Sequence, residues 1–296
     1  MRCNQGNGLT MKNSITEENL SSDKRDLRRF LLAFLGLFCI IALVVPLVLS
    51  LTFSEETLAR FTMLISAFVE IGIIFVFSRI VLQRLGGKPA LTTNFKPRQI
   101  LEAFLLAAVA FLIARLTTDG IWWVYVGTTD DFESVKQTTG MDNWAFAAAL
   151  LFLALIPAIC EEMFYRVTVH ALLKRRKAST IVALSSVAFC LAHIGSGWES
   201  MVSALILGII LIWKYIQTGN YWLVVAVHFL FNGFILFFSH KIYWITDIGF
   251  LSSRASSGAE AVFWGMVYLA CALVTTGFAV LLVGRKDHVL STLIEN

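Results

Sequence analysis

Charged residues are scarce in this chain. Lys, Arg, Asp and Glu make up 15% of the 296 residues, whereas hydrophobic residues make up 57% and the mean hydropathy is +0.75. A soluble domain carries about 25% charged residues. The composition therefore excludes an ordinary soluble domain and predicts an integral membrane protein. The net charge of +4 is small, and we attribute it to basic cytoplasmic loops rather than to a nucleic-acid partner.

Paired cysteine spacing and a cleavable signal peptide are also missing. The chain has five cysteines, most of them in or near apolar segments, where a free thiol behaves as a small hydrophobe. We expect neither a disulfide framework nor a zinc knot. Residues 1–28 are polar and lack the charged-then-apolar form of a signal peptide. We therefore expect polar cytoplasmic tails at 1–28 and 285–296, flanking one transmembrane domain over 29–284.

Long apolar stretches dominate the rest of the chain and predict an all-α membrane protein. A bilayer core takes about 20 apolar residues per helix. Eight stretches qualify: 29–52, 62–83, 99–117, 143–172, 179–195, 201–217, 221–239 and 260–283. The sequence thus predicts a bundle of about eight transmembrane helices without a soluble domain.

The basic residues predict how this bundle is oriented. They concentrate in the amino-terminal tail, in the loops after the second and fourth spans, and in the tail after the eighth span. With eight spans, all four segments lie on one side. Because cytoplasmic loops carry an excess of Lys and Arg, we expect both termini in the cytoplasm. We take the membrane to be a bacterial-type plasma membrane.

Three of the spans carry polar side chains at similar depth. A charge at mid-membrane costs at least about 2.5 kcal/mol, so such residues are functional candidates. Glu161 and His193 lie about 20 Å and about 24 Å from the basic turn at 174–177 that joins their spans. On the seventh span, His228 and Asn232 are about 12 Å and about 18 Å deep, and their spacing of four places them on one helix face. We expect these residues to surround a polar catalytic cavity inside the bilayer.

A second pair supports this set. Glu162 and Arg166 are four residues apart, a spacing that favours an ion pair, and we expect them to fix the helix face that presents Glu161. Polar residues also bond membrane helices to one another, typically for less than about 2 kcal/mol. Six such residues at matched depth favour function over helix bonding. For Glu70, in the second span, the two interpretations are balanced. Arg115 is expected to snorkel at the end of its span.

Most signatures of intramembrane proteases are missing. The chain has no H-E-x-x-H, no G-x-S-G and no pair of intramembrane aspartates. What remains is one glutamate, two histidines and an asparagine. Glu161 can act as general base toward water, His193 can orient that water, and His228 with Asn232 can bind the oxyanion. Alternatively Glu161, His193 and His228 form a zinc ligand set with an open position.

Three motifs in order carry a resemblance to a known family. They are "EEMFYR" at 161–166, matching E-E-x-x-x-R; "FCLAH" at 189–193, matching F-x-x-x-H; and "HFLFN" at 228–232, matching H-x-x-x-N. The chain thereby resembles the CPBP family of intramembrane proteases, which includes the CAAX prenyl endopeptidases and bacteriocin-processing or self-immunity proteins. The resemblance covers residues 143–240.

The resemblance implies an eight-helix endopeptidase with Glu161 and His193 as its catalytic pair and His228 and Asn232 as its oxyanion site. A glutamate-type hydrolase needs no cofactor, although older descriptions of the family call it metal-dependent. We expect the substrate to be a membrane-embedded or lipidated protein or peptide, with prenylated CAAX substrates as one class. Two alternatives are a non-proteolytic immunity or partner-binding membrane protein and, less favoured, a proton-coupled transporter.

Overall fold

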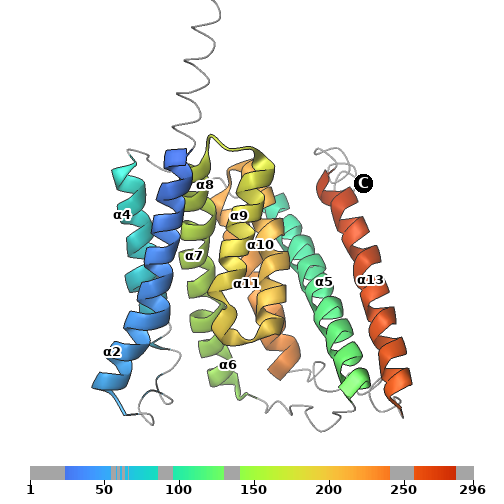
Figure 1. Ribbon diagram of the computed structural model, residues 1–296. Coiled ribbons are helices and arrows are strands. Elements are labelled where there is room, and N and C mark those ends of the chain that lie inside the picture. The colour runs from blue at the N-terminus through green and yellow to red at the C-terminus, as the bar shows by residue number, and fades with distance from the viewer. Residues whose placement is uncertain are drawn as a thin grey trace, which may run out of the picture.

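The computed structural model describes residues 24–54, 58, 61, 64–65, 67–85, 96–129, 141–240 and 257–284. Within this part of the chain the regular structure is helical throughout, without a strand, and the helices run side by side as a bundle (Figure 1). The predicted all-α fold is therefore confirmed. Most of both predicted tails lies outside the described residues, and the chain is already helical at residue 24.

The helical elements follow one another closely. A helix over residues 24–39 continues into π-helical η1 and into α2, and another continues from π-helical η2 into α4. The elements are η1 (Ile40–Val44), α2 (Val45–Thr52), η2 (Glu70–Phe75), α4 (Val76–Arg84), α5 (Pro97–Thr129), α6 (Asn143–Ala149), η4 (Leu150–Leu155), α7 (Ile156–Glu162), η5 (Met163–Thr168), α8 (Val169–Leu173), α9 (Ala178–Ala192), η6 (Ile194–Ser196), α10 (Trp198–Thr218), α11 (Tyr221–His240) and α13 (Gly258–Gly284).

Five helices in the described part are long and apolar enough to cross a membrane. They are Pro97–Thr129, Asn143–Leu173, Trp198–Thr218, Tyr221–Ser239 and Gly258–Gly277. Helix α9 is also apolar but has only 15 residues. The first two predicted spans lie in a region that is described only in part, so the number of eight stays a prediction. The helices identify an integral membrane protein.

Helix α5 is longer than the sequence predicted. The third span was expected to end at residue 117, but α5 continues to Thr129. Its polar residues are satisfied within the helix: Arg115 Nε donates to Asp119 Oδ2 over 2.7 Å, and Thr118 Oγ1 donates to the carbonyl of Ala114 over 3.0 Å. Because these partners lie one turn apart, the helix does not have to end at the polar residues. The expectation that Arg115 snorkels at a helix end was therefore wrong.

Helices α5 and α13 pack closely through glycines. A Cβ atom added to Gly265 would lie 2.8 Å from the carbonyl oxygen of Gly120, and one added to Gly127 would lie 2.5 Å from the carbonyl oxygen of Gly258. Small residues allow membrane helices to approach this closely. Helix α13 is thereby held beside α5, away from α7 (Figure 1).

Several predicted cytoplasmic segments lie at one end of the bundle. The start of the first helix, the end of α4, the start of α5, the turn between α8 and α9 and the end of α13 are all at this end (Figure 1). Arg175 Nε in the turn lies 4.0 Å from Asp26 Oδ2 in the first helix. This arrangement agrees with the sorting of basic residues to one side. Which side of a membrane it is remains a prediction.

Candidate active site

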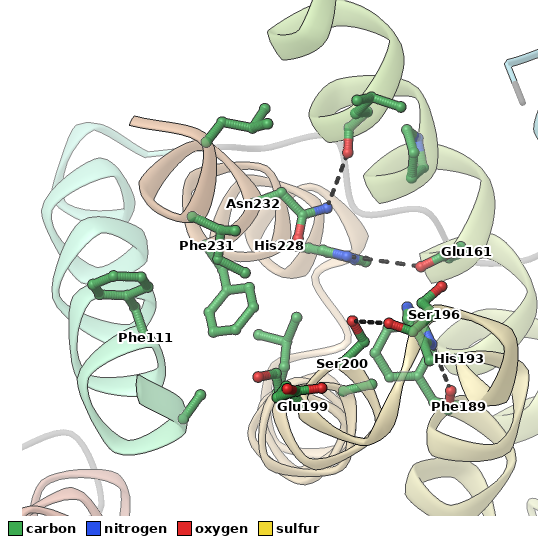
Figure 2. A pocket seen from close by; sticks show the side chains of 18 of the residues that line it. Phe111, Glu161, Phe189, His193, Ser196, Glu199, Ser200, His228, Phe231 and Asn232 are labelled. Carbon is green, nitrogen blue, oxygen red and sulfur yellow. Dashed lines mark hydrogen bonds and ion pairs between the residues drawn. The ribbon is translucent and has the colours of Figure 1, made fainter. Parts of the chain in front are cut away.

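One pocket brings the predicted polar residues together. It has a volume of about 470 Å³ and is lined by Glu161 from α7, His193 at the end of α9, and His228 and Asn232 from α11 (Figure 2). Glu70 from η2 also lines it. The four side chains that were expected at similar depth thus line one pocket of the structure.

Glu162 lies behind the pocket and holds two partners. Its Oε2 lies 2.9 Å from Arg166 Nε, so the expected ion pair is present, although its angle is unfavourable for a hydrogen bond. Its Oε1 lies 2.8 Å from His228 Nδ1. Neither Glu162 nor Arg166 has exposed surface, and His228 is 2% exposed. A buried charge needs such partners, because an unpaired charge costs several kcal/mol there.

The contact between Glu162 and His228 was not predicted from the sequence. Spacing along one helix pairs Glu162 with Arg166 alone and says nothing about a partner 66 residues away. The contact fixes the orientation of the imidazole. With Nδ1–H donating to Glu162, the Nε2 atom of His228 faces the pocket, where it lies 3.7 Å from Glu161 Oε2 (Figure 2).

His193 is oriented by its own helix. It follows the last residue of α9, and its Nδ1 lies 2.9 Å from the carbonyl oxygen of Phe189. Because a carbonyl only accepts, Nδ1 carries the proton, and Nε2 is left for a partner in the pocket. The fixed tautomer suits a residue that orients water.

Phe189, the first residue of the F-x-x-x-H motif, contacts three site residues. Its ring centroid lies 4.8 Å from that of His193 and 5.7 Å from that of His228, both edge-on, and Arg166 Cζ lies 4.7 Å from it. The guanidinium over the ring is a cation–π contact. The spacing of the motif is thus explained by packing: the phenyl ring separates Arg166 from the pocket and supports both imidazoles.

Asn232 is tied to the helix that carries Glu161. Its Nδ2 lies 3.5 Å from the carbonyl oxygen of Leu153, a long hydrogen bond. Leu153 lies four residues before Pro157, which has no N–H to donate to that carbonyl. The amide of Asn232 therefore occupies a position that proline leaves open.

Wide helical turns lie on both sides of the glutamates. η4 precedes α7, and η5 begins directly after Glu162, where Thr168 Oγ1 donates to the carbonyl of Met163 over 2.9 Å. Such π-helical turns occur frequently at functional sites. They carry the helix Asn143–Leu173 past Pro157, and the kink expected at this proline stays a prediction.

Further polar residues line the pocket without having been predicted to do so. Arg115 and Thr118 come from α5, and Glu199, Ser200 and Ser203 from α10 (Figure 2). Ser200 Oγ donates to the carbonyl of Ser196 over 3.1 Å. The i,i+4 spacing of Arg115 and Asp119 is a signal that could have been used, although Arg115 was expected only to snorkel. Isolated serines after α9 have no pattern of their own.

The zinc alternative finds no support in this geometry. Among the described residues, no group of three or more His, Cys, Asp or Glu side chains is arranged to hold a metal ion. The Nδ1 atoms of His193 and His228 are occupied by Phe189 and Glu162, which leaves each Nε2 free for the pocket. Histidines that bind a metal have the same arrangement, so the tautomers do not separate the two mechanisms. Glu161, His193 and His228 line one pocket but are not grouped as a three-ligand set.

Comparison with known proteins places the site in a family. Residues 143–234 match the family described as type II CAAX prenyl endopeptidase Rce1-like. This segment contains all three motifs and four of the residues that line the pocket, Glu161, His193, His228 and Asn232. No curated protein and no solved structure matched the chain. The match of residues 143–234 to the Rce1-like model agrees with the resemblance to the CPBP family of intramembrane proteases found from the motifs.

Proposed function

We propose that this protein is an intramembrane endopeptidase in which Glu161 activates water for peptide-bond hydrolysis. The family supports a CAAX-type intramembrane protease in general. The observation that carries the mechanism is the pocket itself, where Glu161 faces Nε2 of His228 beside His193 and Asn232. Packing of apolar helices does not require a carboxylate, two imidazoles and an amide to line the same pocket.

The reaction balances with these groups alone. Glu161 takes a proton from a water molecule oriented by His193, while the water oxygen bonds to the scissile carbonyl carbon and the carbonyl becomes an oxyanion. The tetrahedral intermediate then collapses, the C–N bond breaks, and Glu161 returns the proton to the leaving nitrogen. The products are a carboxylic acid and an amine.

The oxyanion site requires a donor at Nε2 of His228. Glu162 at Nδ1 stabilises the imidazolium form, in which both ring nitrogens donate, and Arg166 balances the second oxygen of Glu162. A positive charge on His228 at the pocket wall is therefore supported by the buried series of Arg166, Glu162 and His228. Asn232 Nδ2 adds a second donor by turning from the Leu153 carbonyl toward the oxyanion.

The proposed substrate is a membrane-associated protein or peptide, with prenylated CAAX-type chains as the first class to test. The protease core would cover residues 143–240 within a transmembrane domain at 29–284, with both termini in the cytoplasm of a bacterial-type plasma membrane. No resident cofactor is required by the steps above.

Glu161→Gln tests this proposal. In purified protein, we expect the substitution to lower cleavage of membrane-peptide libraries, including farnesylated carboxy-terminal peptides, by a factor on the order of 10² to 10⁴. Glu102→Gln serves as control because Glu102 pairs with Lys214 outside the pocket. Equal cleavage by Glu161→Gln and the parent would reject the assignment. An immunity or binding role predicts a phenotype that survives alanine at Glu161, His193 and His228.

A further inference from the structure

The geometry points to Glu70 as a second carboxyl group of the hydrolytic pocket, which shares a single proton with Glu161. This inference rests on the proposed function only for its catalytic consequence. Glu70 lies outside residues 143–234, and it comes from a different helix than any of the four predicted site residues.

Glu70 is placed in the pocket by the packing of η2 against α7. It is the first residue of η2 and lines the same pocket as Glu161. Its Oε2 atom is buried and has no hydrogen-bond partner. No ion pair joins Glu70 to a Lys, Arg or His anywhere in the described part of the chain. Glu70 therefore lacks a cationic partner, whereas the buried carboxylates Asp119 and Glu162 each have one.

No ion pair gives Glu70 a cationic partner among the described residues. Its electrostatic neighbours are Glu161 and the Cys160 thiol in α7 and the Tyr165 phenol in η5. α4 continues the same helix, and its Arg79 forms no ion pair with Glu70.

The cationic groups at or behind the pocket have other partners. Arg166 is paired with Glu162, and Arg115 is paired with Asp119. His193 Nδ1 is bonded to the carbonyl of Phe189, and His228 Nε2 lies 3.7 Å from Glu161 Oε2. Of Glu70 and Glu161, Glu70 is therefore the carboxyl group without a cation and the one that retains the proton.

The shared proton has a defined role. With Glu70 protonated, Glu161 is the single ionised carboxylate and is ready to accept a proton from water. The pair then carries one negative charge instead of two, which a buried pocket tolerates far better. Glu70 acts through Glu161 and is a positioning residue: when it holds the proton, the negative charge of the pair stays on the carboxylate that acts as base.

Infrared spectroscopy of the purified protein tests the proton directly, without any need for proteolysis. At neutral pH we expect the carboxylic-acid C=O band to be weaker in Glu70→Gln than in the parent, by the intensity of one carboxylic-acid group. Glu102→Gln should leave the band unchanged, because Glu102 is ion-paired with Lys214 and has similar burial. Glu70→Met, apolar and of similar volume, replaces Glu70→Gln if the latter does not fold. A band that is the same in the parent and in the folded Glu70 variant overturns the inference.

The pH profile of cleavage tests the consequence. In the parent, the doubly protonated pair is inactive, the singly protonated pair is active, and ionisation of the second carboxyl group lowers activity again at high pH. In Glu70→Gln the second carboxyl group is absent, so its share of the alkaline loss disappears, while the loss that follows deprotonation of the His228 imidazolium remains. Identical alkaline limbs in both proteins contradict the inference. If the parent cleaves nothing, the proposed function fails, while the infrared band still decides where the proton lies.

Discussion

Nδ1 of His228 lies 2.8 Å from Oε1 of Glu162, in a part of the bundle where this carboxylate has no exposed surface. The contact joins α11 to the helix that carries both glutamates. It gives the two neighbouring carboxylates different tasks. Glu162 orients the imidazole from behind, whereas Glu161 faces the pocket from the front.

Substitutions in the Glu162–Arg166 pair are expected to affect the stability and the activity of the protein differently. Glu162→Met and Arg166→Met should each lower the free energy of unfolding by about 3–5 kcal/mol, because each leaves a buried charge without its partner. The double substitution should cost less than the sum of the two. Its activity should nevertheless stay low, because His228 has lost its carboxylate. Equilibrium unfolding in detergent and cleavage assays measure the two effects. Additive losses of stability would contradict the pairing.

Asn232→Ala is expected to lower kcat by about 10²- to 10³-fold with little change in KM, because one oxyanion donor is removed. Ser200→Ala is the matched control, since Ser200 lines the same pocket but bonds only to the carbonyl of Ser196. We expect the control to keep nearly the parental kcat. A mainly raised KM for Asn232→Ala would assign this amide to substrate binding instead.

Gly265→Ala is expected to lower the free energy of unfolding by about 1–3 kcal/mol, because its Cβ would lie 2.8 Å from the carbonyl oxygen of Gly120 and force α5 and α13 apart. Gly277→Ala, in the same helix, has no atom within 4 Å of the added carbon and should not destabilise the protein. Helix α13 does not line the pocket, so cleavage per folded molecule should be unchanged in both variants. Equal thermal unfolding of the two variants would refute the close packing.

Exhaustive chelation is expected to leave cleavage intact, because the proposed steps need no metal and no three-ligand group forms among the described residues. The test compares cleavage rates before and after treatment with chelator, and then after addition of zinc. Loss of activity that only zinc restores would show that the pocket rearranges into a metal site.

The sequence alone determined the class of fold and the depth of four residues that line the pocket. Hydropathy fixes where helices can cross a bilayer, and a rise of 1.5 Å per residue sets the depth of each side chain along its own helix. Glu161, His193, His228 and Asn232 could therefore be placed in one layer before any packing was known. The i,i+4 spacing likewise predicted the ion pair of Glu162 with Arg166, since both partners lie on one helix.

Tertiary structure alone decided which side chains of that layer meet. A helix can rotate about its axis without changing the depth of its residues, so depth does not show whether Glu161 or Glu162 faces His228. Packing turned Glu162 toward Nδ1 and Glu161 toward Nε2, continued α5 past Arg115 and Asp119, and brought Glu70 from a distant helix into the pocket. These outcomes depend on contacts between helices far apart in sequence, which no local pattern encodes.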